Sequence, residues 1–118
     1  SPAKPLKDAN VLDKNEIATI NLYTAQYNAS ISAIASKYNL ALVDMNSYMK
    51  TIKSGMGYNG ITLNTTFVTG GAFSLDGVHP NPRGYALIAN EFLKRINATY
   101  NANIPYVDVT KYEGTKFP

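Results

Sequence analysis

In the stretch Phe73-Ser74-Leu75-Asp76-Gly77-Val78-His79-Pro80-Asn81-Pro82-Arg83-Gly84-Tyr85 lie the only histidine of the chain and, three residues before it, an aspartate. The same stretch carries a helix start. Asn81 can cap the helix because its side chain accepts a backbone N–H of the first turn, and Pro82 suits the first helical position, where no N–H is needed. We therefore expect Asp76 and His79 on a short loop held against a rigid helix, a common support for catalytic residues.

An Asp-x-x-His pair has a definite chemical use. Imidazole titrates near neutral pH, so it can accept a proton and return it. A carboxylate at one ring nitrogen fixes the tautomer, orients the ring and stabilises the imidazolium, while the other nitrogen takes the proton of a serine hydroxyl. Short motifs also match by accident, and the same four residues fit an exposed histidine beside a helix cap, with Asp76 in a turn.

The longer string Asp76-Gly77-Val78-His79-Pro80, followed by Gly84-Tyr85 and an amphipathic helix, resembles the last signature block of the SGNH hydrolases, also called GDSL-like esterases and lipases. In that family the Asp and His of this block complete a Ser-His-Asp triad. The resemblance thus implies that Asp76 is the orienting acid and His79 the base. It extends backward through the helix and strand expected before the loop, and it covers most of the chain.

The other blocks of that family are not found in this chain. The family carries its nucleophile in a Gly-Asp-Ser block, followed by a glycine and an Asn-Asp block for the oxyanion. This sequence has no Gly-Asp-Ser, and its Asn59-Gly60 is not followed by Asp. We therefore interpret residues 1–118 as the C-terminal segment of a single SGNH-hydrolase-like domain, and we expect negligible esterase activity from this chain alone.

Two segments before the loop have a clear pattern. Asp13-Lys14-Asn15-Glu16 has the form of a capping box, and apolar or aromatic residues then recur at steps of three and four as far as Tyr38. This predicts a helix over about residues 14–38, with a core-facing stripe and a left-handed stop at Asn39. The apolar run Leu40-Ala41-Leu42-Val43 predicts a strand that is covered on both faces.

The segments after this strand are less regular. Asp44 fits the cap of a short helix over about residues 46–53, although it also fits a ligand site at the carboxyl edge of a sheet. Residues 54–72 hold many glycines and predict a long loop, either a wall over a substrate cleft or a packed surface loop.

The helix after His79 is expected to end near residues 98–100. Its broad apolar face should consist of Tyr85, Ile88, Ala89, Phe92, Leu93 and Ile96, with Leu87 off this face, where it is compatible with a second contact surface. Gly84 would let another backbone come close. Arg83 fits a solvated side chain better than one in contact with an anionic or carbonyl group. The tail from Asn101 is compatible with a strap across the domain.

Together these elements predict an α/β fold. A lone buried strand needs neighbours, because unpaired buried N–H and C=O groups are costly. We therefore expect the C-terminal part of a three-layer α/β/α sandwich with a flavodoxin-like parallel sheet, incomplete without an N-terminal half. Such a chain should dock with that missing half or associate with copies of itself.

Composition excludes several function classes. The net charge is +3, but the Lys and Arg residues are dispersed, so we expect no nucleic-acid partner. The absence of cysteine excludes disulfides and thiol catalysis. No apolar run is long enough to span a membrane. Asp76 and His79 are too few for a usual zinc site, and ester hydrolysis by a triad needs no cofactor.

The sequence thus supports one function and one alternative. The first is ester hydrolysis, in which His79 is general base and then general acid, Asp76 orients it, and the serine lies outside this chain. The resemblance implies an acyl ester, on a lipid or on an acylated carbohydrate. The alternative is a non-catalytic carbohydrate- or protein-binding or assembly module, in which the abundant tyrosines and asparagines contact sugar or protein.

Overall fold

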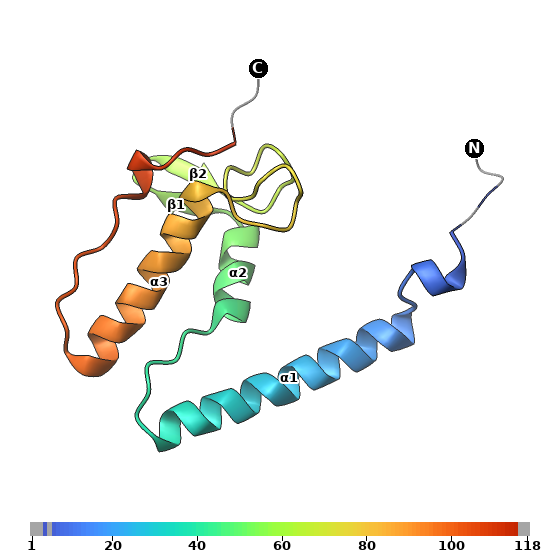
Figure 1. Ribbon diagram of the computed structural model, residues 1–118, viewed down its shortest axis with the longest axis horizontal. Coiled ribbons are helices and arrows are strands. Elements are labelled where there is room, and N and C mark those ends of the chain that lie inside the picture. Colours follow the sequence, from blue (N-terminus) through green and yellow to red (C-terminus); the bar gives the residue numbers. More distant parts are fainter. Residues whose placement is uncertain (1–3, 5, 116–118) are drawn as a thin grey trace. The chain divides into compact units, whose positions relative to one another are not determined.

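The computed structural model describes residue 4 and residues 6–115, and it is mostly helical (Figure 1). The chain divides into two compact units, one ending at Leu40 and one beginning at Ala41. The elements follow in the order η1 (Asp8–Asn10), α1 (Lys14–Lys37), α2 (Met45–Lys53), β1 (Met56–Tyr58), β2 (Ile61–Leu63), α3 (Pro82–Tyr100) and η2 (Val109–Lys111).

The first unit is built on α1, whose two ends are set by local signals. The Asp13 carboxylate accepts the N–H of Asn15 at 2.6 Å and of Glu16 at 2.8 Å, and Glu16 accepts the N–H of Asp13 at 2.9 Å. After the helix, Asn39 has a φ of 51°. The capping box and the left-handed stop are therefore confirmed.

The first unit by itself does not cover the stripe of α1 that was predicted to face the core. Its apolar and aromatic side chains are exposed, and besides α1 the described part of this unit contains only the short η1. A helical period reports which residues share a face, but it does not supply the surface that would cover that face. The exposed members of the stripe are Ile17, Ile20, Tyr27, Ile31, Ile34 and Tyr38.

The second unit begins with α2 and a β-hairpin. Asp44 caps α2, accepting the N–H of Ser47 at 2.9 Å and its hydroxyl at 2.7 Å, so the cap rather than the ligand site is observed. Where a long loop was expected, β1 and β2 pair antiparallel around Asn59 and Gly60, whose φ angles are 46° and 81°. Two adjacent positive φ angles are what a two-residue type I′ hairpin turn requires, and Asn-Gly is its strongest sequence signal.

The core of the second unit forms where the hairpin and η2 pack on α3. Its buried members are Leu63, Ala86, Leu87 and Val109. Leu87, which lies off the expected apolar face, is 1% exposed, so the second contact surface at this residue is observed. Tyr85 and Phe92 of the expected face are exposed. The broadest apolar face of α3 is therefore not the one that the rest of the unit covers.

The expected three-layer sandwich with a parallel sheet is wrong. The sheet in the described residues has two short antiparallel strands. Residues 40–43 form no strand, since the described chain offers them no neighbouring strand. One polar group of this segment has a side-chain partner instead, because the N–H of Ala41 donates to the Tyr100 hydroxyl at 3.0 Å.

The tail returns along α3, as Figure 1 shows. It leaves the helix at Asn101, which has a φ of 51°. The side-chain amide of Asn97 then bonds both the N–H and the C=O of Ile104, each at 2.9 Å. The amide of Asn90 does the same to Val107, at 2.7 and 2.8 Å. The tail is thus a strap that brings its last described residues back to the start of α3.

Candidate active site

The loop that holds Asp76 and His79 is closed on itself by backbone bonds. Phe73 and Pro80 form an antiparallel bridge, and the N–H of Ser74 donates to the C=O of His79 at 2.8 Å. Inside the loop, the N–H of Gly77 donates to the C=O of Ser74 at 3.1 Å. Gly77 has a φ of 72°, which glycine adopts without strain. These bonds fix the backbone conformation of the loop from which the Asp76 and His79 side chains extend.

The loop brings Asp76 and His79 into direct contact. Oδ2 of Asp76 lies 2.6 Å from Nδ1 of His79. The other carboxylate oxygen, Oδ1, accepts the backbone N–H groups of Val78 and His79, each at 2.9 Å, and the Ser74 hydroxyl at 2.6 Å. The Ser74 hydroxyl, followed by the Val78 N–H and the His79 ring, holds the pKa of Asp76 well below its usual range. Asp76 is therefore ionised at neutral pH.

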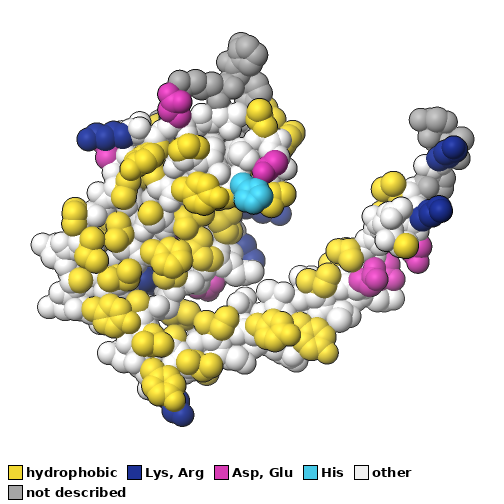
Figure 2. Space-filling view, viewed as in Figure 1, with side chains coloured by type: hydrophobic (Ala, Val, Ile, Leu, Met, Phe, Trp, Pro, Cys, Tyr) yellow, Lys and Arg dark blue, Asp and Glu magenta, His cyan; other side chains and the backbone are white. Residues whose placement is uncertain are grey.

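The imidazole is open to solvent, with a side-chain exposure of 71%, and Figure 2 shows it at the surface beside a carboxylate. Because Nδ1 faces Asp76, Nε2 is the nitrogen left for a reacting group. Within the described residues, no hydroxyl is hydrogen-bonded to Nε2. The apolar side chains of Phe67, Leu75 and Val78 are exposed on the two neighbouring loops.

Asn81 ties the loop, the helix and the tail together. Its Oδ1 accepts the N–H of Gly84 at 2.9 Å, which is the expected helix cap. Its Nδ2 donates to the C=O of Gly71 at 3.0 Å and of Phe73 at 3.2 Å, and lies 3.3 Å from the Thr115 hydroxyl. The side chain is 5% exposed, so these bonds replace water that it has lost.

The tail also braces the loop directly. The Thr115 hydroxyl donates to the C=O of Phe73 at 2.8 Å, and the Arg83 backbone N–H donates to the C=O of Glu113 at 3.2 Å. Nε of Arg83 donates to the C=O of Tyr112 at 3.1 Å. The expectation of a solvated Arg83 is therefore wrong, and the carbonyl contact is observed. No short-range sequence signal connects Thr115 with Phe73, so sequence reasoning missed this brace.

Gly84 seats α3 against the segment before the loop. A Cβ at this position would overlap the carbonyl oxygen of Ala72 and would lie 2.9 Å from Cβ of Pro80. The missing side chain thus permits the close backbone approach that was expected from the sequence.

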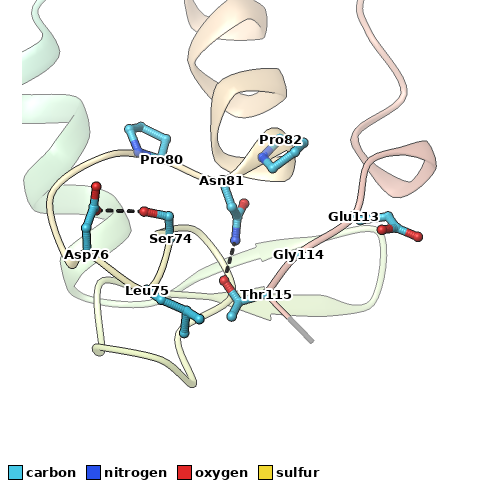
Figure 3. A pocket seen from close by; sticks show the side chains of 9 residues that line it. All are labelled: Ser74, Leu75, Asp76, Pro80, Asn81, Pro82, Glu113, Gly114 and Thr115. Carbon is cyan, nitrogen blue, oxygen red and sulfur yellow. Dashed lines mark hydrogen bonds between the residues drawn. The ribbon is translucent and has the colours of Figure 1, made fainter. Parts of the chain in front are cut away.

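A pocket of about 560 Å³ lies between the loop and the tail (Figure 3). Asp76 lines it, but His79 does not. The pocket is therefore formed by the loop residues around Asp76 and by the end of the tail, and the imidazole of His79 lies outside it. The lining residues are Ser74, Leu75, Asp76, Pro80, Asn81, Pro82, Glu113, Gly114 and Thr115.

The described residues offer neither a metal cluster nor a membrane-spanning helix. No group of three or more His, Cys, Asp or Glu side chains there is arranged to hold a metal ion. Among the helices of that part of the chain, none combines the length and apolar character needed to span a bilayer.

Comparison with known proteins gives one finding. The model of the family described as GDSL-like Lipase/Acylhydrolase matches residues 2–92, which include the whole Asp76–His79 loop and the first half of α3. The comparison with curated proteins gave no match. The comparison with solved structures gave none either.

Proposed function

This chain belongs to the GDSL-like lipase/acylhydrolase family, and on that basis we propose that Asp76 and His79 are the acid and the base of a Ser-His-Asp triad that hydrolyses acyl esters. The observation that carries the proposal is the 2.6 Å contact between Oδ2 of Asp76 and Nδ1 of His79, on a ring that is otherwise open. That contact leaves Nε2 as the nitrogen that exchanges the proton.

The reaction follows from these two roles. A serine hydroxyl attacks the ester carbonyl carbon, and its proton passes to Nε2 of His79. The imidazolium formed is stabilised by the Asp76 carboxylate. The tetrahedral intermediate then expels the alcohol, which takes the proton from Nε2, and water repeats the sequence to release the acid. The chemistry requires no metal or organic cofactor.

We further propose that the nucleophile is not part of residues 1–118. The chain has no Gly-Asp-Ser block, and the Ser74 hydroxyl, the nearest candidate, donates to Asp76 and not to His79. A separate segment that carries the family's Gly-Asp-Ser block would have to complete the site. The substrate in this proposal is an acyl ester of a lipid or of a carbohydrate.

Turnover of p-nitrophenyl acetate tests this proposal. The chain alone should give negligible activity, because removal of a triad serine costs on the order of a million-fold in kcat. Adding or co-expressing a polypeptide with the Gly-Asp-Ser block should restore turnover, and His79→Ala should abolish the gain. Restored turnover that survives His79→Ala would contradict the role of the base. Rapid His79-dependent turnover by the chain alone would instead place a nucleophile within it.

One observation favours the alternative, a carbohydrate-binding module. A separate pocket of about 370 Å³ is lined by three tyrosines, Tyr48, Tyr58 and Tyr106, together with the buried Glu91 carboxylate. Tyrosine rings are suited to contacts with sugar rings, and Glu91 is held there by Arg95, whose Nε lies 2.7 Å from its Oε1. Saturable binding on a glycan array, unchanged by Asp76→Ala and His79→Ala but lost in Tyr58→Ala, would favour this function over hydrolysis.

A further inference from the structure

Resting on the proposed function, we propose that Ser74 is the positioning residue of the pair, and that its hydroxyl fixes the Asp76 carboxylate so that Oδ2 alone faces the imidazole ring of His79. The family match does not assign any role to this serine. Its hydroxyl lies 2.6 Å from Oδ1 of Asp76, as short as the contact between Asp76 and His79 itself.

The two oxygens of Asp76 have different surroundings. Oδ1 accepts three donors, the Ser74 hydroxyl and the N–H groups of Val78 and His79, whereas Oδ2 accepts the imidazole. The last torsion of an aspartate side chain is broad and roughly two-fold, so the covalent structure alone does not orient the carboxylate plane. Three donors at one oxygen do orient it. Of these, the Ser74 hydroxyl is the donor that comes from a side chain, and it can therefore be removed without altering the backbone.

Ser74 is itself held in place from both sides. Its N–H and C=O take part in the bonds that close the loop, to His79 and from Gly77. The carbonyl of Phe73, which precedes it, accepts both Asn81 and Thr115. The hydroxyl therefore starts from a fixed backbone, and its proton is directed to a carboxylate. This is the geometry of a group that orients Asp76 and not of a serine activated by His79.

The pKa of Asp76 is consistent with this role. Among the contacts that lower the pKa of this carboxyl, the Ser74 hydroxyl has the largest effect. A hydroxyl that donates to the ionised form favours that form. Ser74 thus keeps Asp76 both oriented and charged, the two properties that an imidazole partner needs.

The ratio of the two neutral tautomers of His79 reports whether Ser74 orients Asp76, and it can be measured without any catalytic activity. His79 is the only histidine, so every imidazole signal in a ¹⁵N–¹H spectrum of the full chain comes from this residue. We expect the neutral ring to carry its proton on Nδ1, facing Asp76. In Ser74→Ala the ratio of Nδ1–H to Nε2–H should fall about fivefold, the effect of one net hydrogen bond. Ser74→Thr, which keeps the hydroxyl, should restore the ratio.

Three further variants make every outcome decisive. Asp76→Asn should shift the ratio at least as far as Ser74→Ala, whereas Ser54→Ala, at an exposed serine that bonds the Lys50 carbonyl, should leave it unchanged. If Ser74→Ala loses the native amide pattern, Ser74→Cys, with a weak donor of similar size, takes its place. A folded Ser74→Ala or Ser74→Cys with the wild-type ratio would overturn the role of Ser74 alone, and so would a folded Ser74→Thr that resembles Ser74→Ala. An Asp76→Asn ratio equal to the wild type would instead overturn the Asp–His pair and with it the proposed function.

Discussion

At Asn81 one buried side chain performs two tasks that an aspartate could not combine. Its carbonyl oxygen caps α3, and its NH₂ group donates to carbonyls of the segment before the Asp76–His79 loop. Sequence reasoning identified the cap, because the acceptor role and the following proline are local signals. It missed the donor role, because Gly71, Phe73 and Thr115 become neighbours of Asn81 only in the folded chain.

Replacing Asn81 by Asp separates these two tasks. The variant keeps a capping oxygen, but it removes the side-chain donor to the Gly71 carbonyl, leaves the Phe73 carbonyl with Thr115 alone and adds a buried charge. We therefore expect a loss of about 1–3 kcal/mol in the free energy of unfolding. Urea unfolding measures the loss. The matched control is Asp13→Asn at the exposed cap of α1, which should change little because both residues cap well. Equal effects in the two variants would contradict the donor role.

The Asp76 carboxylate should make the loop sensitive to acid. Its folded-state pKa is lowered from 3.8, so its contribution to stability is fully present above about pH 4 and is lost as the pH falls toward the lower folded value. The difference in thermal midpoint between the wild type and Asp76→Asn should therefore shrink below about pH 4. A difference that is constant from pH 7 to pH 2 would contradict the bonding described for this carboxylate.

At the scale of elements, the sequence located helices well because their ends are encoded by a few adjacent residues. The predicted bounds of α1, α2 and α3 agree with the structure within about two residues, as cap signals allow. The strand at residues 40–43 failed, because a strand exists only through a partner that no local pattern reveals. The hairpin was missed although Asn59-Gly60, flanked by Tyr58 and Ile61, carried the signal for it.

The seating of α3 gives a test with an internal control. Gly84→Ala places a methyl group against the Ala72 carbonyl, and we expect a destabilisation of about 1–3 kcal/mol despite the better helix propensity of alanine. Gly57→Ala, where nothing lies within 4 Å of the added Cβ, should be nearly neutral. Chemical denaturation of both variants measures the difference. A Gly84→Ala chain that is as stable as Gly57→Ala would contradict the close approach.

At the scale of the whole molecule, the largest error of the sequence analysis concerns what lies in the core. The periods of α1 and α3 predicted one apolar face on each helix, whereas the buried cluster of the second unit consists of Leu63, Ala86, Leu87 and Val109. Val109 belongs to the tail, which no motif connected to α3. The candidate pair Asp76 and His79 could be named from sequence because four adjacent residues specify it. The braces from Asn81 and Thr115 required the fold.

The exposed apolar side chains of α1 predict association of the chain. Besides η1, the described part of the first unit has no other element to cover this row of apolar side chains, and large exposed apolar patches are uncommon on monomeric proteins. Size-exclusion chromatography with light scattering should give a mass above that of one chain, or a monomer that binds a polypeptide carrying the Gly-Asp-Ser block. Charged substitutions on the exposed face, Ile20→Lys with Ile31→Lys, should weaken the association. A folded wild-type monomer that binds neither would contradict this expectation.

Asn90 and Asn97 each bond both backbone groups of one tail residue, and these two attachments match the spacing of the tail to the spacing of α3. Asn90 and Asn97 are seven helical residues apart, about 10.5 Å at 1.5 Å per residue, and their partners Val107 and Ile104 are three extended residues apart, about 10 Å at 3.3 Å per residue. The two spacings agree, so the rise of α3 between Asn90 and Asn97 sets how many tail residues fit between Ile104 and Val107. One residue inserted between the clamped positions would spoil that agreement, and one inserted beyond them would carry Thr115 about 3.3 Å past the carbonyl it meets. The spacing of the two asparagines on α3 thereby fixes the point on the tail from which the chain runs on to Thr115 and the Asp76–His79 loop.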